Sequence, residues 1–276
     1  MGDCRYCHNP AGFLRSQHAE CRQKDENGVS GILDAIAREP TGSSTLLELP
    51  LRTANIAKES FISDNERAEL YLKSWSNGVD KVLEDGLLTD EEEKHLIKLA
   101  EALGLKQDDL NSTGAMMKLT KAAVIKDVLS GIIPKRATFD GSLPINFQKG
   151  EQVVWAFPNS KYLEDKTYRQ YVGASQGISV RLMQGVYYRV GAFKGQPVES
   201  TERVHVDTGW AVVTTKNIYF VGARTSMRVP YVKIVSFDPF SDGLGVMRDT
   251  NNAKLQVFAT GDGWFTYNLV RNLSQM

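Results

Sequence analysis

The spacing of hydrophobic positions changes along the chain and divides it into parts. From about Leu46 to Ile133, apolar residues recur at intervals of three and four, which is the period of a helix with one buried face. From about Leu143, Val, Tyr, Phe, Thr and Trp become frequent between glycines, which is typical of β-strands. The sequence therefore predicts a helical region followed by a β-rich region, after an N-terminal segment without a sustained period.

The helical region contains two capping-box patterns. The pairs are Ser63 with Glu66 and Thr89 with Glu92. At this spacing, each side chain of a pair can accept a hydrogen bond from the backbone amide of the other residue at the start of a helix. The predicted apolar stripes of these helices are Ala68, Leu72, Trp75, Val79 and Leu83, followed by Leu96, Leu99, Ala100 and Leu103. Gly104 suits the end of the second helix. We expect a bundle of about four to five helices.

Eight short segments of the β-rich region are predicted strands. They are "EQVVWAFP", "KTYRQYVG", "GVYYRVGAF", "GWAVVTT", "NIYFVG", "YVKIVSF", "GLGVMRD" and "AKLQVFAT". Lys216-Asn217 predicts a two-residue hairpin turn, because Asn tolerates a positive φ. Near the end, Phe265, Leu269 and Leu273 share one helical face. We expect a bent antiparallel sheet or open barrel with this helix packed into it.

All three cysteines lie within the first 21 residues, in the pattern C-x2-C-x10-H-x2-C. The pattern comprises Cys4, Cys7, His18 and Cys21, two short-spaced pairs that offer the four soft or borderline ligands that a tetrahedral Zn²⁺ site requires. His8 is a competing ligand, but only His18 is three residues from Cys21 in a segment that reads as helical. The sequence therefore predicts a zinc site with the ligands Cys4, Cys7, His18 and Cys21.

Four protein ligands leave no open position on the ion, so we expect a structural site rather than a catalytic one. A segment of about 25 residues buries too little to fold alone, and the metal would supply most of its folding energy. The segment resembles the small zinc ribbons that begin many multidomain bacterial proteins. Its x10 gap is shorter than in finger proteins that read DNA, which favours a structural or protein-docking role.

The segment "VLEDGLLTDEEEKHLIKLAEALGL" resembles the middle of TerB-like helical domains, and the resemblance covers about residues 60–135. TerB-like proteins carry acidic residues thought to bind metal, and here only Asp85 and the run from Asp90 to Glu93 match them. A calcium loop around Gly86 is excluded because Lys81 and Leu83 would occupy its first ligand positions. The acidic run is explained by its place in the first turn of a helix.

The segment "TGWAVVTTKNIYFVGARTSMRVPYVKIVSF" resembles the GRAM and bacterial PH-like families, and the likeness extends over about residues 145–276. The matching positions are Thr214, Lys216, Tyr219, Phe220, Arg228, Pro230, Lys233 and Ile234. An added part, "YRQYVGASQGISVRLMQGVYYRVGAFKG", is longer than a minimal domain needs. The resemblance implies a β-barrel or sandwich with a C-terminal helix that binds phosphoinositides, other anionic groups or proteins.

Anionic lipid would require a cluster of basic residues. The candidates are Lys161, Lys166 and Arg169, and separately Arg181, Arg189 and Lys194. Residues 139–276 carry a net charge of only +4, which favours scattered surface charge. The aromatic residues Trp155, Tyr187, Tyr188 and Trp210 are expected in the core or in cross-strand pairs.

Charge and motifs limit the function classes. The whole chain has zero net charge, which argues against a strongly basic nucleic-acid binder. The N-terminus lacks the apolar segment of a secretory signal, and no run approaches a membrane span. Nucleotide-binding, hydrolase and metalloprotease motifs are absent, and His95 and His205 have no evident nucleophile nearby in sequence. We expect a cytoplasmic protein that is not an enzyme.

These patterns predict a multidomain α+β protein. Its expected parts are a zinc ribbon (1–25), a connector (26–45), a helical TerB-like domain (46–138) and a PH/GRAM-like domain (139–276). The favoured function is an adaptor that binds protein partners, and proteins combining such modules occur in bacterial stress and anti-phage systems. The alternatives are a peripheral membrane sensor of anionic lipid and a nucleic-acid-associated zinc protein. The oligomeric state stays open.

Overall fold

A computed structural model describes most of the chain. It covers residues 2–13, 15–40, 44–136, 145–171, 180–183, 186–188, 197–251 and 253–276, with side chains described except for Ser44 and residues 166–201. The chain divides into two compact units, Met1–Ile132 and Ile133–Met276. The first unit is helical and the second is built on an antiparallel sheet, so the fold is mixed α+β.

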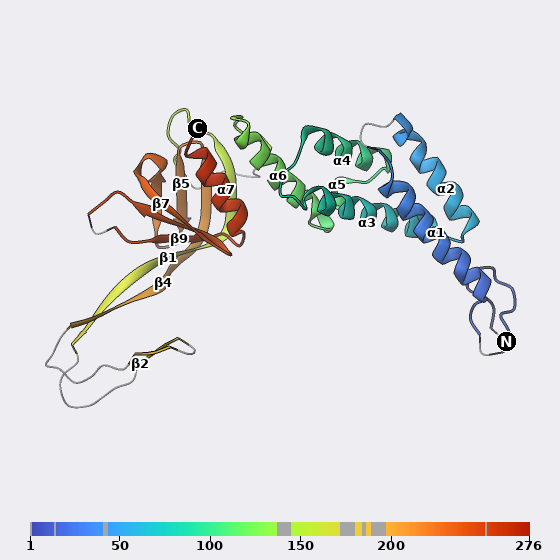
Figure 1. The fold of residues 1–276 in the computed structure, drawn as a ribbon, viewed down its shortest axis with the longest axis horizontal. Helices are drawn as coiled ribbons and strands as arrows, with labels where there is room; N and C mark the ends of the chain where they lie inside the picture. Colours follow the sequence, from blue (N-terminus) through green and yellow to red (C-terminus); the bar gives the residue numbers. More distant parts are fainter. Residues whose placement is uncertain are drawn as a thin grey trace. The chain divides into compact units, whose positions relative to one another are not determined.

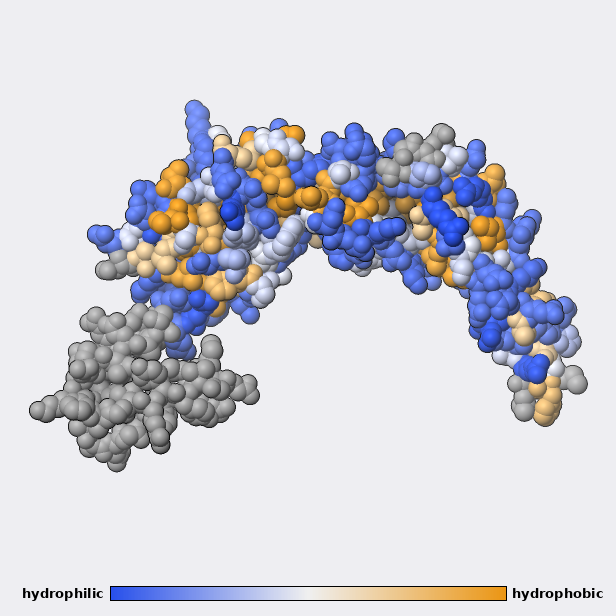
Figure 2. Space-filling model, in the orientation of Figure 1, coloured by the Kyte–Doolittle hydropathy of each residue, from blue (hydrophilic) through white to orange (hydrophobic). Residues whose placement is uncertain are grey.

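The first unit consists of the N-terminal knuckle and a set of helices (Figure 1). They are α1 (Ala19–Ala37), η1 (Ser44–Glu48), α2 (Leu49–Glu59), α3 (Asp64–Val82), α4 (Asp90–Ala102), α5 (Gln107–Ser112) and α6 (Ala115–Leu129). Hydrophilic residues predominate on the visible face of these helices (Figure 2). None of the helices in the described part of the chain combines the length and apolar character that crossing a membrane requires.

Both predicted capping boxes are present. Ser63 and Glu66 cap α3, and Thr89 and Glu92 cap α4, each with both reciprocal hydrogen bonds. The predicted stripe of α4 is buried, and Gly104 follows the helix with a φ of +67°. These local signals are strong because each satisfies amide groups that a helix end leaves unpaired.

The buried face of α3 differs from the predicted stripe. Tyr71, Trp75 and Val79 are buried, whereas Ala68 is exposed. The Trp75 indole N–H donates to the Leu96 carbonyl on α4 at 2.8 Å, which fixes how the two helices pack. The hydroxyl of Tyr71 has a hydrogen-bond partner in the core, the Thr53 hydroxyl on α2, so this polar side chain can be buried. The spacing of apolar residues does not reveal this partner.

Helix α1 runs without interruption through most of the segment expected as a connector, residues 26–45. Gly28 and Ile32 on α1 are buried, and a Cβ atom at Gly28 would lie 2.2 Å from the Ser60 Cβ atom. The helix therefore packs closely against the turn that follows α2. Gly28, which lies in the segment expected as a connector, is the residue that allows this contact.

The second unit contains a seven-stranded antiparallel sheet with the order β6-β5-β4-β1-β9-β8-β7. The strands are β1 (Val153–Tyr171), β4 (Pro197–Thr214), β5 (Asn217–Gly222), β6 (Ser226–Pro230), β7 (Ile234–Phe240), β8 (Gly243–Arg248) and β9 (Gln256–Ala259). A separate pair is formed by β2 (Val180–Met183) and β3 (Val186–Tyr188). The sheet is open rather than a closed barrel, since β6 and β7 do not pair within the described residues.

The helix at the chain end, α7 (Gly263–Leu273), packs on the sheet as its pattern predicted. Phe265, Leu269 and Leu273 are buried, and the Phe265 ring lies 4.9 Å from the Trp155 ring, centroid to centroid. Trp155 is thus a core residue, as expected. Trp210, on β4, remains about one-third exposed, with a relative accessibility of 36%.

The predicted turn at Lys216-Asn217 is wrong by one residue. Asn217 is the first residue of β5, and the turn is formed by the two residues after Thr214. The Thr214 hydroxyl accepts hydrogen bonds from the amides of Lys216 and Asn217, which sets the turn without a positive φ at Asn217. The buried Asn217 amide group donates to the Glu151 carboxylate at 2.6 Å.

The distal halves of β1 and β4 form a two-stranded arm (Figure 1). Beyond Glu164, β1 pairs only with β4, whereas Lys161–Glu164 pair also with β9. Two of the expected strands, "EQVVWAFP" and "KTYRQYVG", are therefore largely one strand. The added part, residues 168–195, includes the end of β1 and the strands β2 and β3, and its other residues lie outside the described part of the chain.

Candidate metal centre

A short turn positions the first cysteine pair. The Cys4 amide donates to the Asn9 carbonyl at 2.7 Å, and the His8 amide donates to the Cys4 carbonyl at 2.8 Å. A β-bridge between Asp3 and Pro10 closes the loop. The backbone therefore folds into a knuckle that its own hydrogen bonds define.

The start of α1 supplies the second pair. His18 is the N-cap residue of α1 and Cys21 lies in its first turn, so the two side chains share one face. The ligand atoms of Cys4, Cys7, His18 and Cys21 all lie within 4.8 Å of one another. The structure thus brings together the four residues that the spacing singled out, and they could hold a metal ion.

The distances around His18 are those that a tetrahedral ion requires. Its Nδ1 atom lies 3.4 Å from Cys7 Sγ and 3.7 Å from Cys21 Sγ. Zn–S bonds of about 2.3 Å and Zn–N bonds of about 2.0–2.1 Å, at tetrahedral angles, place sulfur and nitrogen ligands about 3.6 Å apart. A single ion can therefore contact all three of these atoms with little movement of the side chains.

The second nitrogen of His18 has a partner of its own. Nε2 lies 3.1 Å from the Pro10 carbonyl oxygen, which can only accept, so Nε2 carries the proton. Nδ1 is then the nitrogen with a free lone pair, and it is the atom that faces the sulfurs. A carbonyl that fixes the tautomer and ring orientation in this way is the usual outer partner of a metal-binding histidine.

The local electrostatics favour negative charge at Cys4, which is fully buried. Burial opposes ionisation of this thiol, but the amides of Cys7, His18 and Tyr6 point at its sulfur and lower its pKa to about 6. Burial, with the neighbouring sulfurs, raises the pKa of Cys21 to about 11. The contact with Cys7 raises the pKa of His18. Thiolates gathered in this way are stabilised by a cation that displaces their protons.

The competing ligand His8 lies outside the cluster. Its side chain is exposed, and its backbone has a φ of +59° at the end of the knuckle turn. Of the two histidines considered as ligands, His18 is the one that lies beside the sulfurs, because it is the N-cap residue of α1.

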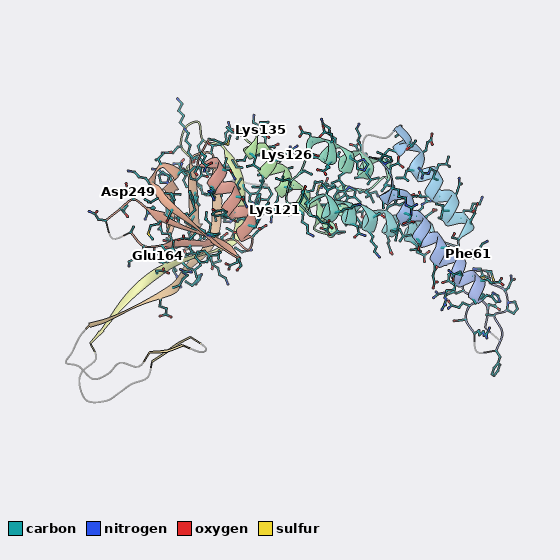
Figure 3. All side chains as sticks on the ribbon, viewed as in Figure 1. Phe61, Lys121, Lys126, Lys135, Glu164 and Asp249 are labelled. Carbon is teal, nitrogen blue, oxygen red and sulfur yellow. The ribbon has the colours of Figure 1, made fainter. Side chains whose placement is uncertain are left out.

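Aromatic contacts attach the knuckle to the helices. The Tyr6 hydroxyl donates to Asp25 on α1 at 3.2 Å, and its ring lies 6.0 Å from the Phe61 ring. Phe61, labelled in Figure 3, has a φ of +63°, which is unusual for a bulky side chain. The ammonium group of Lys24 lies over the Phe61 ring, 5.8 Å from the ring centroid. Sequence reasoning missed this contact, because nothing in the local pattern links Tyr6 to Phe61.

The acidic run that resembles TerB-like domains is paired with a lysine in this chain. Asp90 and Glu93 both pair with the ammonium group of Lys126 on α6, labelled in Figure 3. Glu93 is buried, and burial opposes the charge of Lys126 while the two carboxylates raise its pKa. Within the described residues, the cysteine–histidine cluster is the group of His, Cys, Asp and Glu side chains whose ligand atoms lie close enough together that they could hold a metal ion.

The basic residues expected at a lipid-binding mouth are mostly beyond what the structure describes. The described part of the chain does not include Arg189 and Lys194, or the side chains of Lys166, Arg169 and Arg181. It also leaves out the side chains of the aromatic candidates Tyr187 and Tyr188. Lys161 is described and is exposed on β1.

The two histidines that sequence reasoning considered for catalysis are placed as follows. His95 lies on α4, and burial lowers its pKa. His205 lies on β4 with its Nε2 atom 2.9 Å from the Thr208 hydroxyl.

Searches of protein-family models, of curated proteins and of solved structures found no significant match to this chain. The resemblances to zinc ribbons, TerB-like domains and PH/GRAM-like domains therefore depend on the residues quoted for them.

Proposed function

We propose that Cys4, Cys7, His18 and Cys21 bind one structural Zn²⁺ ion. The observation that carries this proposal is the orientation of His18, whose Nδ1 faces two sulfurs while its Nε2 bonds to the Pro10 carbonyl. Three thiolates and one imidazole are a common ligand set for structural zinc, and softer ligands favour it over Mg²⁺ or Ca²⁺. With four protein ligands, the ion has no position left for a substrate.

The zinc knuckle in turn supports an adaptor function. The ion would hold a surface segment of about 25 residues in one conformation, including Phe13, which is 82% exposed. A rigid loop that presents an exposed aromatic side chain is suited to protein docking. We infer that the chain is a non-enzymatic adaptor whose knuckle contributes to binding a protein partner.

The second unit is consistent with a recognition module. Its antiparallel sheet, followed by a C-terminal helix against the sheet, has the order of elements that the resemblance to PH-like domains implies. This likeness supports the inference that the unit binds a protein or an anionic group.

The adaptor proposal is tested with the full-length chain. Affinity capture with the zinc-loaded protein should recover a stoichiometric protein partner, and a Phe13→Ala variant that still binds zinc should recover less of it. Leu47→Ala is the matched control, because Leu47 is equally exposed, at 84%, but lies on η1. Equal capture by Phe13→Ala and the native chain would contradict docking through the knuckle, and turnover of a substrate would contradict the non-enzymatic assignment.

A further inference from the structure

Helix α2 ends in a left-handed turn at Phe61. The Ile62 amide donates to the Ala57 carbonyl at 3.0 Å, and the Ser60 amide donates to the same oxygen at 3.1 Å. Phe61, between these two residues, has a φ of +63°. This is the Schellman end of a helix, in which one residue beyond the helix adopts the left-handed conformation. Glycine usually occupies that position, because a side chain disfavours a positive φ.

Two other helices of the first unit end in the same way, but with glycine at the left-handed position. Gly104 follows α4 with a φ of +67°, and Gly131 follows α6 with a φ of +72°. In both turns the next residue donates its amide to the carbonyl five positions earlier, at 3.0 and 2.9 Å. Apart from chain neighbours, a Cβ atom at either glycine would meet no described residue within 4 Å, so backbone conformation rather than space selects glycine. The phenylalanine after α2 therefore requires a compensating contact.

The ring of Phe61, labelled in Figure 3, has that contact in the metal-binding knuckle. It lies 6.0 Å from the Tyr6 ring, centroid to centroid, and the Lys24 ammonium group lies 5.8 Å from its centroid. Phe61 is 38% exposed, whereas Ala57 and Ile62 at the same turn are buried in the helical core. The ring thus packs on the knuckle rather than in the core, which is the contact that a glycine would lack.

We propose that Phe61 couples metal binding by the knuckle to the conformation of the turn at residues 60–62. This inference rests on the proposed zinc site. Tyr6 lies in the loop between Cys4 and Cys7, and a segment this short takes its conformation from the ion that its ligands share. With the ion bound, Tyr6 packs on Phe61 and offsets the unfavourable φ. Without the ion, the Tyr6 ring is no longer held against Phe61, and the left-handed conformation loses its compensating contact.

A change at Phe61 reaches the helical core through its two neighbours. Ser60 is the residue against which α1 packs, since a Cβ atom at Gly28 would lie 2.2 Å from the Ser60 Cβ atom. Ile62 is buried, and its amide is bonded to the Ala57 carbonyl. A turn that leaves the left-handed conformation loses this bond and shifts Ser60 relative to α1. Metal binding and the order of the turn therefore favour each other, as linked equilibria must.

Hydrogen exchange of the full-length chain, with and without a zinc chelator, tests the coupling. We expect the Ile62 amide, followed in peptides that cover residues 55–63, to exchange at least about tenfold faster without zinc. In a Phe61→Gly variant the same amide should keep its protection without zinc, since glycine adopts the left-handed conformation without help from Tyr6. A native turn that exchanges at one rate in both states, while residues 2–13 respond to chelation, would overturn the coupling.

Zinc affinity, measured by competition with a chromogenic chelator, gives a second test. Phe61→Gly and Tyr6→Leu should each weaken zinc binding by about threefold to tenfold, the range expected for loss of one aromatic pair. The double variant should bind about as weakly as either single variant, because both changes remove the same contact. Phe13→Ala, at an exposed aromatic residue of the same knuckle, is the control and should bind zinc as the native chain does. Unchanged affinity in both single variants would contradict the coupling.

The outcomes separate this inference from the zinc site on which it rests. One zinc ion per chain, with a turn and an affinity that do not respond to Phe61→Gly, overturns the coupling and leaves the zinc site in place. A chain that binds no zinc overturns both. If Tyr6→Leu fails to fold, Phe61→Gly decides, because glycine is the residue that the ends of α4 and α6 carry at this position.

Discussion

His18 shows what spacing can and cannot reveal about a single side chain. The interval of three residues to Cys21 predicted that His18, and not His8, would join the cysteines. Nothing in the sequence predicted the Pro10 carbonyl as its second partner, because that contact depends on how the knuckle closes. The grouping of these four side chains was therefore predictable, but the contact that sets the tautomer was not.

Replacing His18 tests this assignment. His18→Ala should weaken zinc binding by at least about tenfold, because it removes a ligand together with the Pro10 contact that orients it. Competition with a chromogenic chelator measures the affinity. His8→Ala, a change at the exposed histidine, should leave the affinity unchanged. Equal weakening by both variants would contradict the placement of the ligands.

A buried carboxylate in the second unit gives a pH prediction. Asp207 accepts from the amides of Arg224 (2.6 Å) and Thr225 (2.8 Å), and these bonds lower its pKa. The stabilisation is present above the unfolded pKa of about 3.9 and is lost as the pH falls through the lower folded pKa. Asp207→Asn should therefore lower the melting temperature at pH 7, and the difference from the native chain should shrink below about pH 4.

Thermal unfolding at several pH values measures this difference. Asp249→Asn, at an exposed position in the β8–β9 connection, is the matched control and should show no such dependence. A difference between Asp207→Asn and the native chain that stays constant down to pH 3 would contradict the role of the ionised carboxylate.

At the scale of the element, helix starts were predictable and helix faces were less so. The capping boxes of α3 and α4 were found from sequence because the paired residues lie within one turn. The length of α1 was missed because residues 26–45, with their charged, glycine and serine residues, were expected to form a connector. Gly28 is there because α1 meets the Ser60 turn at close range, and this is a tertiary contact that no local pattern contains.

Two glycines of α1 provide a matched pair of substitutions. Gly28→Ala should destabilise the first unit by about 1–3 kcal/mol, because the new methyl group would lie 2.2 Å from Ser60 Cβ. Gly31→Ala places its methyl group 3.5 Å from Ile56, an ordinary contact, and should stabilise the helix by about 0.5–1 kcal/mol. Urea unfolding followed by circular dichroism measures both, and equal effects would contradict the close approach at Gly28.

The β-rich unit shows the same limit. The final helix was predicted from the spacing of Phe265, Leu269 and Leu273, which are all buried. The joining of two expected strands into β1 was not predictable, because its distal half pairs with a partner far along the chain. The turn after Thr214 was misplaced by one residue since a threonine hydroxyl, and not an asparagine φ, sets it.

At the scale of the whole molecule, the chain forms two compact units with separate sets of contacts. The proposed zinc site lies in the first unit. Chelation of the metal should therefore increase amide hydrogen exchange in residues 2–13 and 15–25 while strands β4, β5 and β8 keep their protection. Mass spectrometry of the full chain with and without chelator measures this, and loss of protection throughout both units would contradict it.

The most direct test of the central claim is elemental analysis of the purified full-length protein. The account predicts one zinc ion per chain in the native protein and much less than one in a Cys7→Ser, Cys21→Ser double variant, because those sulfurs are 3.4 and 3.7 Å from His18 Nδ1. A native chain that takes up no stoichiometric metal when zinc is supplied under reducing conditions would contradict it.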